Sequence, residues 1–351
     1  MSSTSQATST PTQTAPGNDR YSGLQQWLSG LNGHGLRMET LRPASSDASF
    51  RKFYRLDTTD GGTLIAVDAP PATENIKAYL QVTALLGGMK LSVPEVLATD
   101  TEQGYLLVSD LGTHTYGSLL NHDNAHQLYA DAVDSLILMQ VQSRPGVLPE
   151  YDRAFILREL NIFVEWYLGR HLGVTLNEAQ QKTLDQIFEK LTASALAQPQ
   201  VFMHRDYHSR NLIWMQKGNP GIVDFQDAVY GPITYDLVSL LRDAYVEWDE
   251  EMVLDWAIRY WEKARRAGLP VSNDIDAFYR DFEWMGLQRH LKILGIFTRL
   301  HYRDGKDYYL DDIPTVLNYV RKTAHRYKEL APLLRLIDEL EQIPRQSGYT
   351  F

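Results

Sequence analysis

The sequence predicts an α+β protein with two lobes, a small antiparallel-sheet lobe followed by a larger helical lobe. Short apolar and alternating runs separated by turn residues occupy positions 36–109, which is the pattern of a sheet. After Asp110–Gly112 the composition becomes strongly helical, and one polar loop within Val201–Asp224 interrupts it between short apolar runs. At 351 residues the chain is long enough for two such lobes. We expect a disordered leader over residues 1–20, the first lobe over 21–112 and the second over 113–345.

The composition argues against several classes of function. The net charge is −10, from 34 basic and 44 acidic side chains, so no overall basic field attracts nucleic acid or an anionic membrane. The chain contains no cysteine, which removes disulfides, thiolate metal sites and cysteine nucleophiles. Residues 1–16 are almost all Ser, Thr, Gln, Ala and Pro and hold no apolar run typical of a signal peptide or a membrane span. We therefore expect a cytoplasmic protein and infer no obligate protein partner.

The elements expected in the first lobe follow apolar periodicity and turn residues. Apolar residues at helical spacing predict helices over 21–31 and 74–86, and two glycines follow the second helix. Strands are expected over 36–41, 50–57, 63–69, 96–99 and 105–109. The pair Asp60-Gly61 is a strong hairpin signal between the second strand and the third. The run of small residues at 43–49 is expected to be a loop between the first two strands.

The second lobe is expected to be a layer of helices around the polar loop. Helical periodicity covers 126–142, 153–169, 177–191, 234–245 and most of 250–327. Two short strands, 200–203 and 212–215, flank the loop and would hold it rigidly. Gly231-Pro232 is expected to form a turn.

The polar loop has the residue types and spacing of a phosphoryl-transfer site. His204, Asp206 and Asn211 follow the pattern H-x-D-x-x-x-x-N, and Asp224 ends the next apolar run. Phosphoryl transfer needs one carboxylate to accept a hydroxyl proton, the role predicted for Asp206. It also needs a carboxamide and a second carboxylate to hold Mg²⁺ against nucleotide phosphates, the roles predicted for Asn211 and Asp224. The alternative is a hairpin with polar turn residues.

Two further regions of the second lobe carry candidate site residues. Asp236 lies close to the start of a predicted helix, where it would cap N–H groups or, as we favour, orient the loop together with His204. Trp284, Gln288 and Arg289 lie in a segment rich in aromatic and polar side chains, which suits a sugar or another hydroxylated ligand. A core aromatic stripe with exposed charges is the alternative.

The first lobe offers candidates for binding a nucleotide. The loop of small residues that ends at Ser49 would let backbone N–H groups approach a phosphate, although a serine-rich turn has the same composition. Arg51, Lys52 and Arg55 are candidates to meet phosphate, or else solvated charges of an edge strand. The backbone after the last strand would face the edge of adenine.

These features together resemble the aminoglycoside phosphotransferase and choline kinase branch of the protein-kinase-like fold. The specific part is HRDYHSRN followed by IVDFQDA and GPITYDLVSLLRD. The short interval between Asp224 and Asp236 leaves no room for a peptide-docking segment, so the substrate should be a small molecule. Within this branch, DASFRKFYRL, LIAVDAPP, LLVSDLG, RELNIFVEWYL and LQRHLKILGIFTRLHYRDGK are similar to the bacterial anomeric kinases of N-acetylmuramate and N-acetylglucosamine.

The resemblance implies a bilobal fold and transfer of the ATP γ-phosphate to the C1 hydroxyl of an amino sugar. In that family the sugar 1-phosphate feeds the synthesis of UDP-amino sugars in cell-wall recycling. The resemblance implies ATP and Mg²⁺ as cofactors and an adenine contact at Ser109, Asp110 and Leu111. It also implies sugar contacts from a larger set: Glu159, Arg205 or His208, Trp284, Gln288 and Arg289.

One residue departs from the wider kinase pattern, and two other functions remain open. Asp68 lies where kinases place a phosphate-binding lysine, so we expect Arg51, Lys52 or Arg55 to supply the cation. A kinase of aminoglycosides or amino alcohols would need an acidic pocket, whereas N-acetylmuramate carries a carboxylate and would need a cation such as Arg205 or Arg289. A nucleotide-binding but inactive scaffold is the third possibility.

Overall fold

The computed structural model describes residues 16–45 and 50–341, and these divide into two compact units. The sheet unit contains the described residues up to Leu80 together with Pro94–Asp110. The helical unit contains Gln81–Val93 and the described residues from Leu111 onward. Most of the predicted leader and the candidate Ser49 lie outside the described residues.

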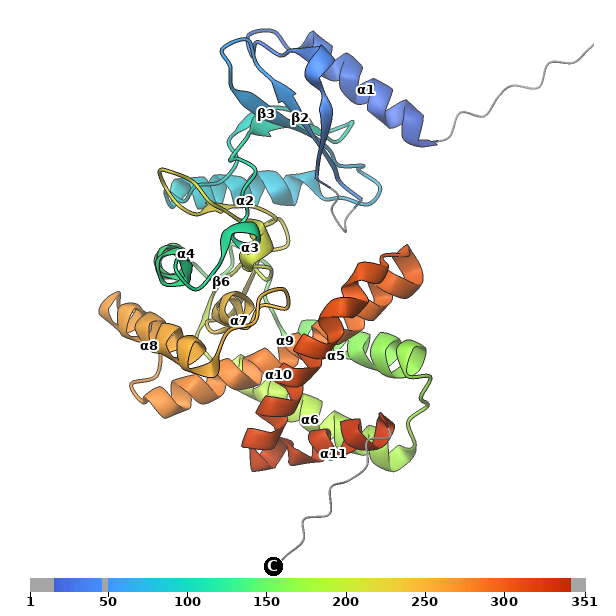
Figure 1. Ribbon diagram of the computed structural model, residues 1–351, viewed down its shortest axis with the longest axis vertical. Coiled ribbons are helices and arrows are strands. Elements are labelled where there is room, and N and C mark those ends of the chain that lie inside the picture. Colours follow the sequence, from blue (N-terminus) through green and yellow to red (C-terminus); the bar gives the residue numbers. More distant parts are fainter. Residues whose placement is uncertain (1–15, 46–49, 342–351) are drawn as a thin grey trace, which may run out of the picture. The chain divides into compact units, whose positions relative to one another are not determined.

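The sheet unit is built on five antiparallel strands in the order β1-β2-β3-β5-β4 (Figure 1). The strands are β1 (Arg42–Ser45), β2 (Lys52–Asp57), β3 (Thr63–Asp68), β4 (Val96–Asp100) and β5 (Tyr105–Ser109). Helix α1 (Pro16–Gly30) covers the sheet through Leu24 and Leu28, which lie one turn apart and pack with Leu56 and Leu107. Burying these four leucines removes the most apolar part of this unit from water.

Four of the five strands expected in this unit are confirmed within two residues at each end. The hairpin at Asp60-Gly61 is also confirmed: Asp57 pairs with Thr63, and Gly61 has φ +87°, a left-handed conformation that favours glycine. Helix α2 (Ile76–Gly88) begins and ends two residues later than expected, and its residues from Gln81 belong to the helical unit.

The strand expected over 36–41 is wrong. Leu36 makes a single bridge to Thr58, and the chain then forms a 3₁₀ turn over Met38–Thr40. The hydroxyl of Thr40 donates to the carbonyl of Arg37 at 2.6 Å and accepts from the backbone N–H of Asp57 at 2.8 Å, so a side chain replaces the strand ladder. The edge strand β1 follows instead, in a stretch expected to be loop. Pro43 is tolerated there because an edge strand leaves one row of backbone groups unpaired.

Besides the end of α2 and three short 3₁₀ turns, the helical unit contains ten helical segments in the part of the chain that is described. They are α3 (Tyr116–Leu119), α4 (Ala125–Val141), α5 (Arg153–Ile162), a π-helical segment (Phe163–His171), α6 (Glu178–Ala197), α7 (Tyr235–Leu241), α8 (Glu250–Arg266), α9 (Ile275–Asp304), α10 (Ile313–Arg326) and α11 (Ala331–Leu340). The helices expected over 126–142, 153–169 and 177–191 are therefore confirmed. The helix expected over 234–245 is shorter, because the backbone leaves the helical conformation at Arg242.

The strands around the polar loop pair differently from the expected arrangement. Strand β6 (Gln200–Met203) does not pair with β7 (Leu212–Ile213); β6 pairs with β9 (Val229–Pro232), and β7 with β8 (Gly221–Ile222). The turn expected at Gly231-Pro232 is wrong, since Gly231 lies opposite Val201 in the β6–β9 ladder. A side chain at Gly231 would collide with the sulfur of Met203, so glycine permits this close pairing.

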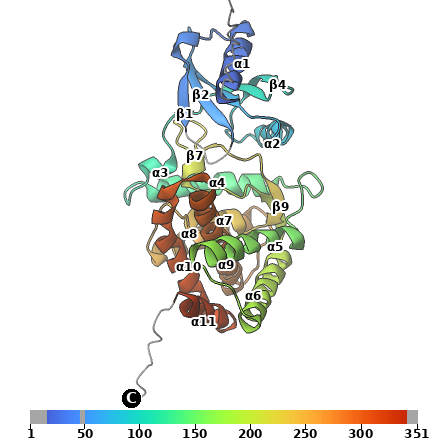
Figure 2. The same cartoon turned by 90° about the vertical axis from the view of Figure 1, so that its right-hand side faces the viewer.

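Helix α9 is the longest helix described and packs against α5, α6, α7 and α10 (Figures 1 and 2). Gly295 allows the closest of these approaches: a Cβ there would lie 2.5 Å from the carbonyl carbon of Ile162 and 2.6 Å from the nitrogen of Phe163. This is the point at which α5 changes into the π-helical segment. The contact holds α9 against α5, and both helices carry candidate site residues.

Candidate active site

Asp236 fixes the backbone of the polar loop. It lies in the first turn of α7 with 1% of its surface exposed, and its carboxylate accepts from the N–H groups of His204, at 2.6 Å, and Arg205, at 2.9 Å. Arg205 has φ +78°, an unfavourable conformation for a side chain of this size, and these two bonds hold it there. Burial raises the pKa of Asp236 to about 7, against the effect of the two N–H donors. The resulting turn presents Asp206.

His204 ties the loop to the end of the neighbouring apolar run. Its ring is fully buried, with Nε2 placed 3.1 Å from the carbonyl oxygen of Val223 and Nδ1 accepting from the N–H of Asp206 at 3.3 Å. These two bonds suit one neutral tautomer, in which Nε2 carries the proton. Burial lowers the pKa of His204 to about 4, so the ring is neutral at physiological pH. The neutral ring of His204 therefore holds the loop backbone in position and does not transfer a proton.

Asn211 and Asp224 lie side by side, and both side chains carry oxygen atoms of the kind that binds a divalent cation. The amide nitrogen of Asn211 donates to the backbone carbonyl of Asp206 at 3.0 Å and to Oδ2 of Asp224 at 3.3 Å, so the carboxamide oxygen points away from both. Gln226 donates to the other carboxylate oxygen of Asp224 at 3.0 Å. Oxygen donors of this kind fit a hard divalent cation such as Mg²⁺.

The described residues contain no group of three or more His, Cys, Asp or Glu side chains arranged to hold a metal ion. The pair therefore provides only part of a coordination sphere, and phosphate and water oxygens would complete it, as is usual for Mg²⁺ with nucleotides.

Asp206 is ionised because of the cations around it. Burial acts to raise its pKa, but the charges of Lys292 and Arg205, followed by those of His208 and Arg289, hold the pKa below its ordinary value. A carboxylate in this state can accept a hydrogen bond from a hydroxyl group and orient it for attack on a phosphoryl group.

A buried ionic network, which we call the Glu159 cluster, lies beside the loop and consists of Tyr151, Glu159, Arg205, Gln288 and Lys292. One oxygen of Glu159 accepts from Arg205 at 2.6 Å and lies 3.0 Å from Nζ of Lys292, and the other accepts from the hydroxyl of Tyr151 at 2.5 Å. Gln288 donates to that same hydroxyl at 2.9 Å. Although burial would raise the pKa of Glu159, Lys292 and Arg205 lower it to about 2.

The candidate sugar-binding residues of the helical unit do not all meet at this cluster. Glu159, Gln288 and Arg205 belong to it, and His208 lies in the loop with its ring edge against Tyr245 at 5.4 Å. Trp284 is placed elsewhere on α9 by its contacts, with its ring against Tyr327 and beneath Arg280. Arg289 is described below, because its surroundings differ from those of the other arginines.

Sequence reasoning missed several side chains that hold this site together. Lys292 was part of the aromatic and polar segment but was not selected, although it lies one turn beyond Gln288 on the same face of α9. Tyr151 and Gln226 had no recognisable signal. Asp243, which accepts from the N–H of Ser209 at 3.0 Å, also had none beyond its place in the GPITYDLVSLLRD stretch.

The candidate phosphate-binding cations of the sheet unit have different surroundings. Arg55 donates twice to Asp110, at 2.5 and 3.0 Å, so it binds the residue expected beside adenine. Arg51 is 8% exposed and lies 3.6 Å from Glu74, just ahead of α2. Lys52 is exposed and forms no ion pair with a described carboxylate.

The position of the usual lysine is taken by a buried ion pair in the sheet unit. Asp68 is 2% exposed and accepts from Nε of Arg20 at 2.9 Å. Ser109 uses its N–H on the carbonyl of Glu95 at 2.9 Å, and its hydroxyl accepts from the N–H of Glu95 at 2.8 Å. The N–H of Ser109 is therefore engaged within the sheet unit and is not left for adenine.

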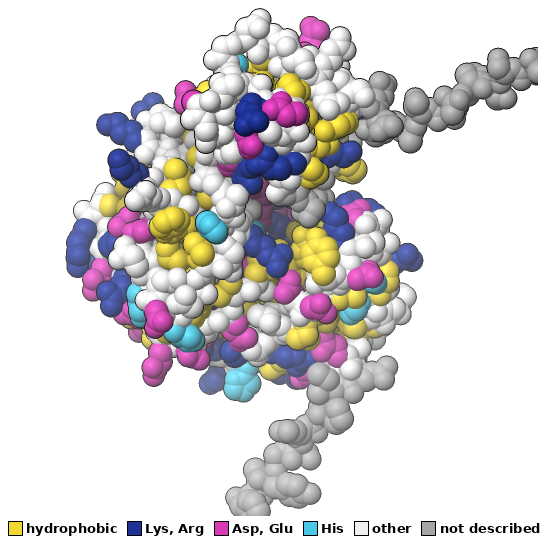
Figure 3. Space-filling view, turned by 45° about the horizontal axis from the view of Figure 1, so that its top comes forward, with side chains coloured by type: hydrophobic (Ala, Val, Ile, Leu, Met, Phe, Trp, Pro, Cys, Tyr) yellow, Lys and Arg dark blue, Asp and Glu magenta, His cyan; other side chains and the backbone are white. Residues whose placement is uncertain are grey.

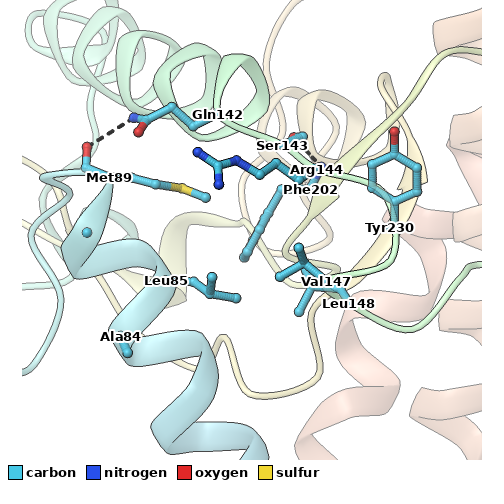
Figure 4. Close-up of a pocket in the computed structure, with 11 residues that line it drawn as sticks. Ala84, Leu85, Met89, Gln142, Ser143, Arg144, Val147, Leu148, Phe202 and Tyr230 are labelled. Carbon is cyan, nitrogen blue, oxygen red and sulfur yellow. Dashed lines mark hydrogen bonds between the residues drawn. The ribbon is translucent and has the colours of Figure 1, made fainter.

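A separate cavity of about 290 Å³ lies in the helical unit (Figure 4). Leu85, Val147, Leu148 and Phe202 line its apolar side, and the side chain of Arg144 extends into it. None of the candidate site residues lines this cavity, so we do not assign the chemistry to it.

The surface shown in Figure 3 carries acidic and basic side chains intermixed, without a broad field of one sign. No helix among the described residues has the length and apolarity needed to cross a membrane.

Comparisons with known proteins find one family and a shared fold. Residues 40–269 match the model of the phosphotransferase enzyme family. The chain is 49% identical over 315 residues to the N-acetylmuramate/N-acetylglucosamine kinase of Neisseria meningitidis serogroup B, covering 88% of this chain and 93% of that protein. It is 46% identical over 302 residues to the kinase of the same name from Pseudomonas putida, covering 86% of this chain and 88% of that protein.

Among solved structures, the chain is similar to the amicoumacin kinase hAmiN in complex with AMP-PNP, Ca²⁺ and Ami, with a TM-score of 0.60 and 14% identity over 89% of this chain and 96% of that one. At this identity the likeness shows the fold alone, and it confirms the α+β architecture expected from the sequence.

Proposed function

We propose that this chain, which belongs to the phosphotransferase enzyme family, uses ATP to phosphorylate the C1 hydroxyl of N-acetylmuramate or N-acetylglucosamine. Membership of the family makes the chain a kinase and confirms the family resemblance expected from the sequence. The observation that carries the proposal is that Asn211 donates both to the backbone of Asp206 and to the carboxylate of Asp224, which holds the three residues together, within a chain whose relatives at 46–49% identity bear the name of kinases of these two sugars.

The roles we propose for the loop follow from its hydrogen bonds. Asp206 would accept the proton of the acceptor hydroxyl and orient its oxygen toward the γ-phosphate. Asn211 and Asp224 would hold Mg²⁺ through their oxygens, and Mg²⁺, when bound, offsets negative charge on the nucleotide phosphates. Asp236 and His204 keep the loop backbone in place. Because phosphoryl transfer passes through a loose transition state, most of the rate enhancement should come from such positioning.

On the nucleotide side, we propose that Arg51 replaces the missing strand lysine. Arg51 is buried and lies beside Glu74, just ahead of a helix. This pair of opposite charges resembles the lysine–glutamate pair of other kinases. Arg55 is a weaker candidate because Asp110 already occupies its guanidinium. The proposed use of ATP favours the cytoplasm as the site of action.

The charge around Asp206 favours an amino sugar over an aminoglycoside or an amino alcohol. Arg205, Arg289 and Lys292 all act on Asp206, with only Glu159 as an added carboxylate in the cluster. Arg289, which forms no ion pair with a described carboxylate, would repel a polycationic acceptor and attract the carboxylate of N-acetylmuramate. An inactive scaffold is also disfavoured, because the three residues of the loop keep the contacts that phosphoryl transfer requires.

The test is ADP release with a panel of acceptors, followed by phosphorus NMR of the product. We expect turnover with at least one of the two named sugars and a phosphate on C1. Asp206→Asn should lower kcat by about 100- to 10,000-fold while ATP still binds, and Asn211→Ala should raise the Mg²⁺ concentration needed for half-maximal rate. Turnover with aminoglycosides but with neither sugar would replace the proposal with the alternative, and an unimpaired Asp206→Asn variant would remove its central role.

A further inference from the structure

Arg289 is a buried cation that lacks an ion-pair partner among the described residues of the helical unit. It lies on α9 with 3% of its surface exposed, and its NH1 group has no hydrogen-bond partner among the described residues. No described carboxylate of that unit lies within ion-pair distance of its guanidinium. A guanidinium does not lose its proton in a protein, and burying this charge without an anion beside it costs free energy. Such an arrangement is expected where a ligand brings the missing anion.

Arg242 is a buried arginine of the same unit, and its contacts are those of a structural residue. It is 1% exposed, and its guanidinium donates to Glu250 at 2.9 Å and to Glu283 at 3.1 Å. Arg242 is therefore paired with two carboxylates, whereas no described carboxylate forms an ion pair with Arg289.

Arg205 and Lys292, which also act on Asp206, share the carboxylate of Glu159. Arg205 donates to Glu159 at 2.6 Å and to the carbonyl of Asp227 at 3.3 Å, and its guanidinium lies over the ring of Phe155 at 5.0 Å. Lys292 lies 3.0 Å from Glu159 and donates to the hydroxyl of Tyr235 at 3.0 Å. Of the two arginines that the sequence offered for an acidic substrate, the structure leaves Arg289 available.

Arg289 is close enough to the loop for its charge to contribute to the lowered pKa of Asp206 and to that of His208. Polar atoms of the loop and of the adjacent α9 residue are also buried without partners among the described residues: Nδ1 of His208, Nε of Arg205 and Oε1 of Gln288. Donors and an acceptor around an unpaired guanidinium form a site suited to a polar, anionic ligand.

We propose that Arg289 binds a carboxylate carried by the acceptor sugar, and that it thereby sets the preference between acidic and neutral amino sugars. The planar fork of a guanidinium matches a carboxylate in two parallel hydrogen bonds. The proposal rests on the proposed function, because it takes the acceptor to be N-acetylmuramate, which has a carboxylate, or N-acetylglucosamine, which lacks one. A phosphoryl oxygen presents similar chemistry, and the test separates the two sources.

The test compares kcat/KM for the two sugars in wild type, Arg289→Gln, Arg289→Lys and the control Arg280→Gln. Arg280 lies on the same helix but is partly exposed, and it pairs with Glu329 at 3.2 Å. We expect Arg289→Gln to lower the ratio of kcat/KM for N-acetylmuramate over N-acetylglucosamine by about 10- to 100-fold, the effect of losing a charge-assisted pair of hydrogen bonds. Arg289→Lys should recover part of this ratio, mainly through KM, and Arg280→Gln should leave the ratio unchanged.

A second readout does not depend on turnover. Without ligand, Arg289→Gln should unfold at the same temperature as wild type or higher, because it removes an unpaired buried charge. N-acetylmuramate should raise the unfolding temperature of wild type but not of Arg289→Gln.

Three results would overturn the proposal. An equal loss of kcat with both sugars would assign Arg289 to the transferred phosphoryl group, an unchanged ratio would deny it any part in selection, and a marked loss of stability in Arg289→Gln without ligand would make it a structural residue. If wild type phosphorylates neither sugar, the proposed function fails, and the thermal measurement with N-acetylmuramate still decides the carboxylate site.

Discussion

Replacing Asp236 by Asn tests whether one buried carboxylate holds the catalytic loop in its working geometry. The carboxylate accepts from two backbone N–H groups, whereas the carboxamide of the same shape has one oxygen and would point its NH₂ group at the second donor. Asp236 is ionised above its pKa of about 7, and there hydrogen bonds to this charged group contribute about 1.5–3 kcal/mol each. One of the two bonds is lost in the variant, and the left-handed backbone of Arg205 loses part of its support.

A loss of this size corresponds to a fall in kcat of about 10- to 100-fold if it is felt in the placement of Asp206. The assay is ADP release at saturating ATP and sugar, with thermal unfolding measured in parallel to show that the variant is folded. Asp281→Asn is a matched control, since burial also raises the pKa of Asp281, to about 6, but its carboxylate accepts no hydrogen bond from the described loop backbone. If Asp236→Asn keeps kcat within about threefold of wild type, or if Asp281→Asn loses as much, the reasoning is refuted.

Three further predictions concern the nucleotide, the helical core and acid stability. Arg51→Gln should raise the KM for ATP by about tenfold, more than Lys52→Gln does, because Arg51 is buried beside Glu74; equal effects in ATP titrations would contradict this. Glu283→Gln should lower the free energy of unfolding by about 3 kcal/mol in denaturant titrations, since it removes a buried carboxylate from the buried guanidinium of Arg242. The exposed control Asp255→Asn should change it by less than about 0.5 kcal/mol. Glu159 has a folded pKa of about 2, below its unfolded value, so the stability that it contributes is present above about pH 4 and is lost as the pH falls toward 2. Glu159→Gln should therefore flatten the fall in unfolding temperature over this pH range. Parallel curves of unfolding temperature against pH for the variant and wild type would argue against this.

The parts of this protein that the sequence determined are those set by short intervals along the chain. The hairpin at Asp60-Gly61 depends on two residues and a left-handed φ, and it was predictable for that reason. The order of Asp206, Asn211 and Asp224 indicated phosphoryl transfer without any knowledge of the surrounding helices. Helical periodicity located α4, α5 and α6, because an amphipathic face repeats within each segment.

Tertiary structure alone decided which strands and charges are partners. Strand β6 pairs with β9, which lies far along the chain, and Gly231 permits this close pairing. The turn expected at Gly231-Pro232 was therefore wrong. Likewise, nothing local shows that Glu159 neutralises Arg205 and Lys292, since that depends on how closely Gly295 lets α9 approach α5. Opposite charges form ion pairs only after the helices pack. The same packing leaves Arg289 without an ion-pair partner among the described residues.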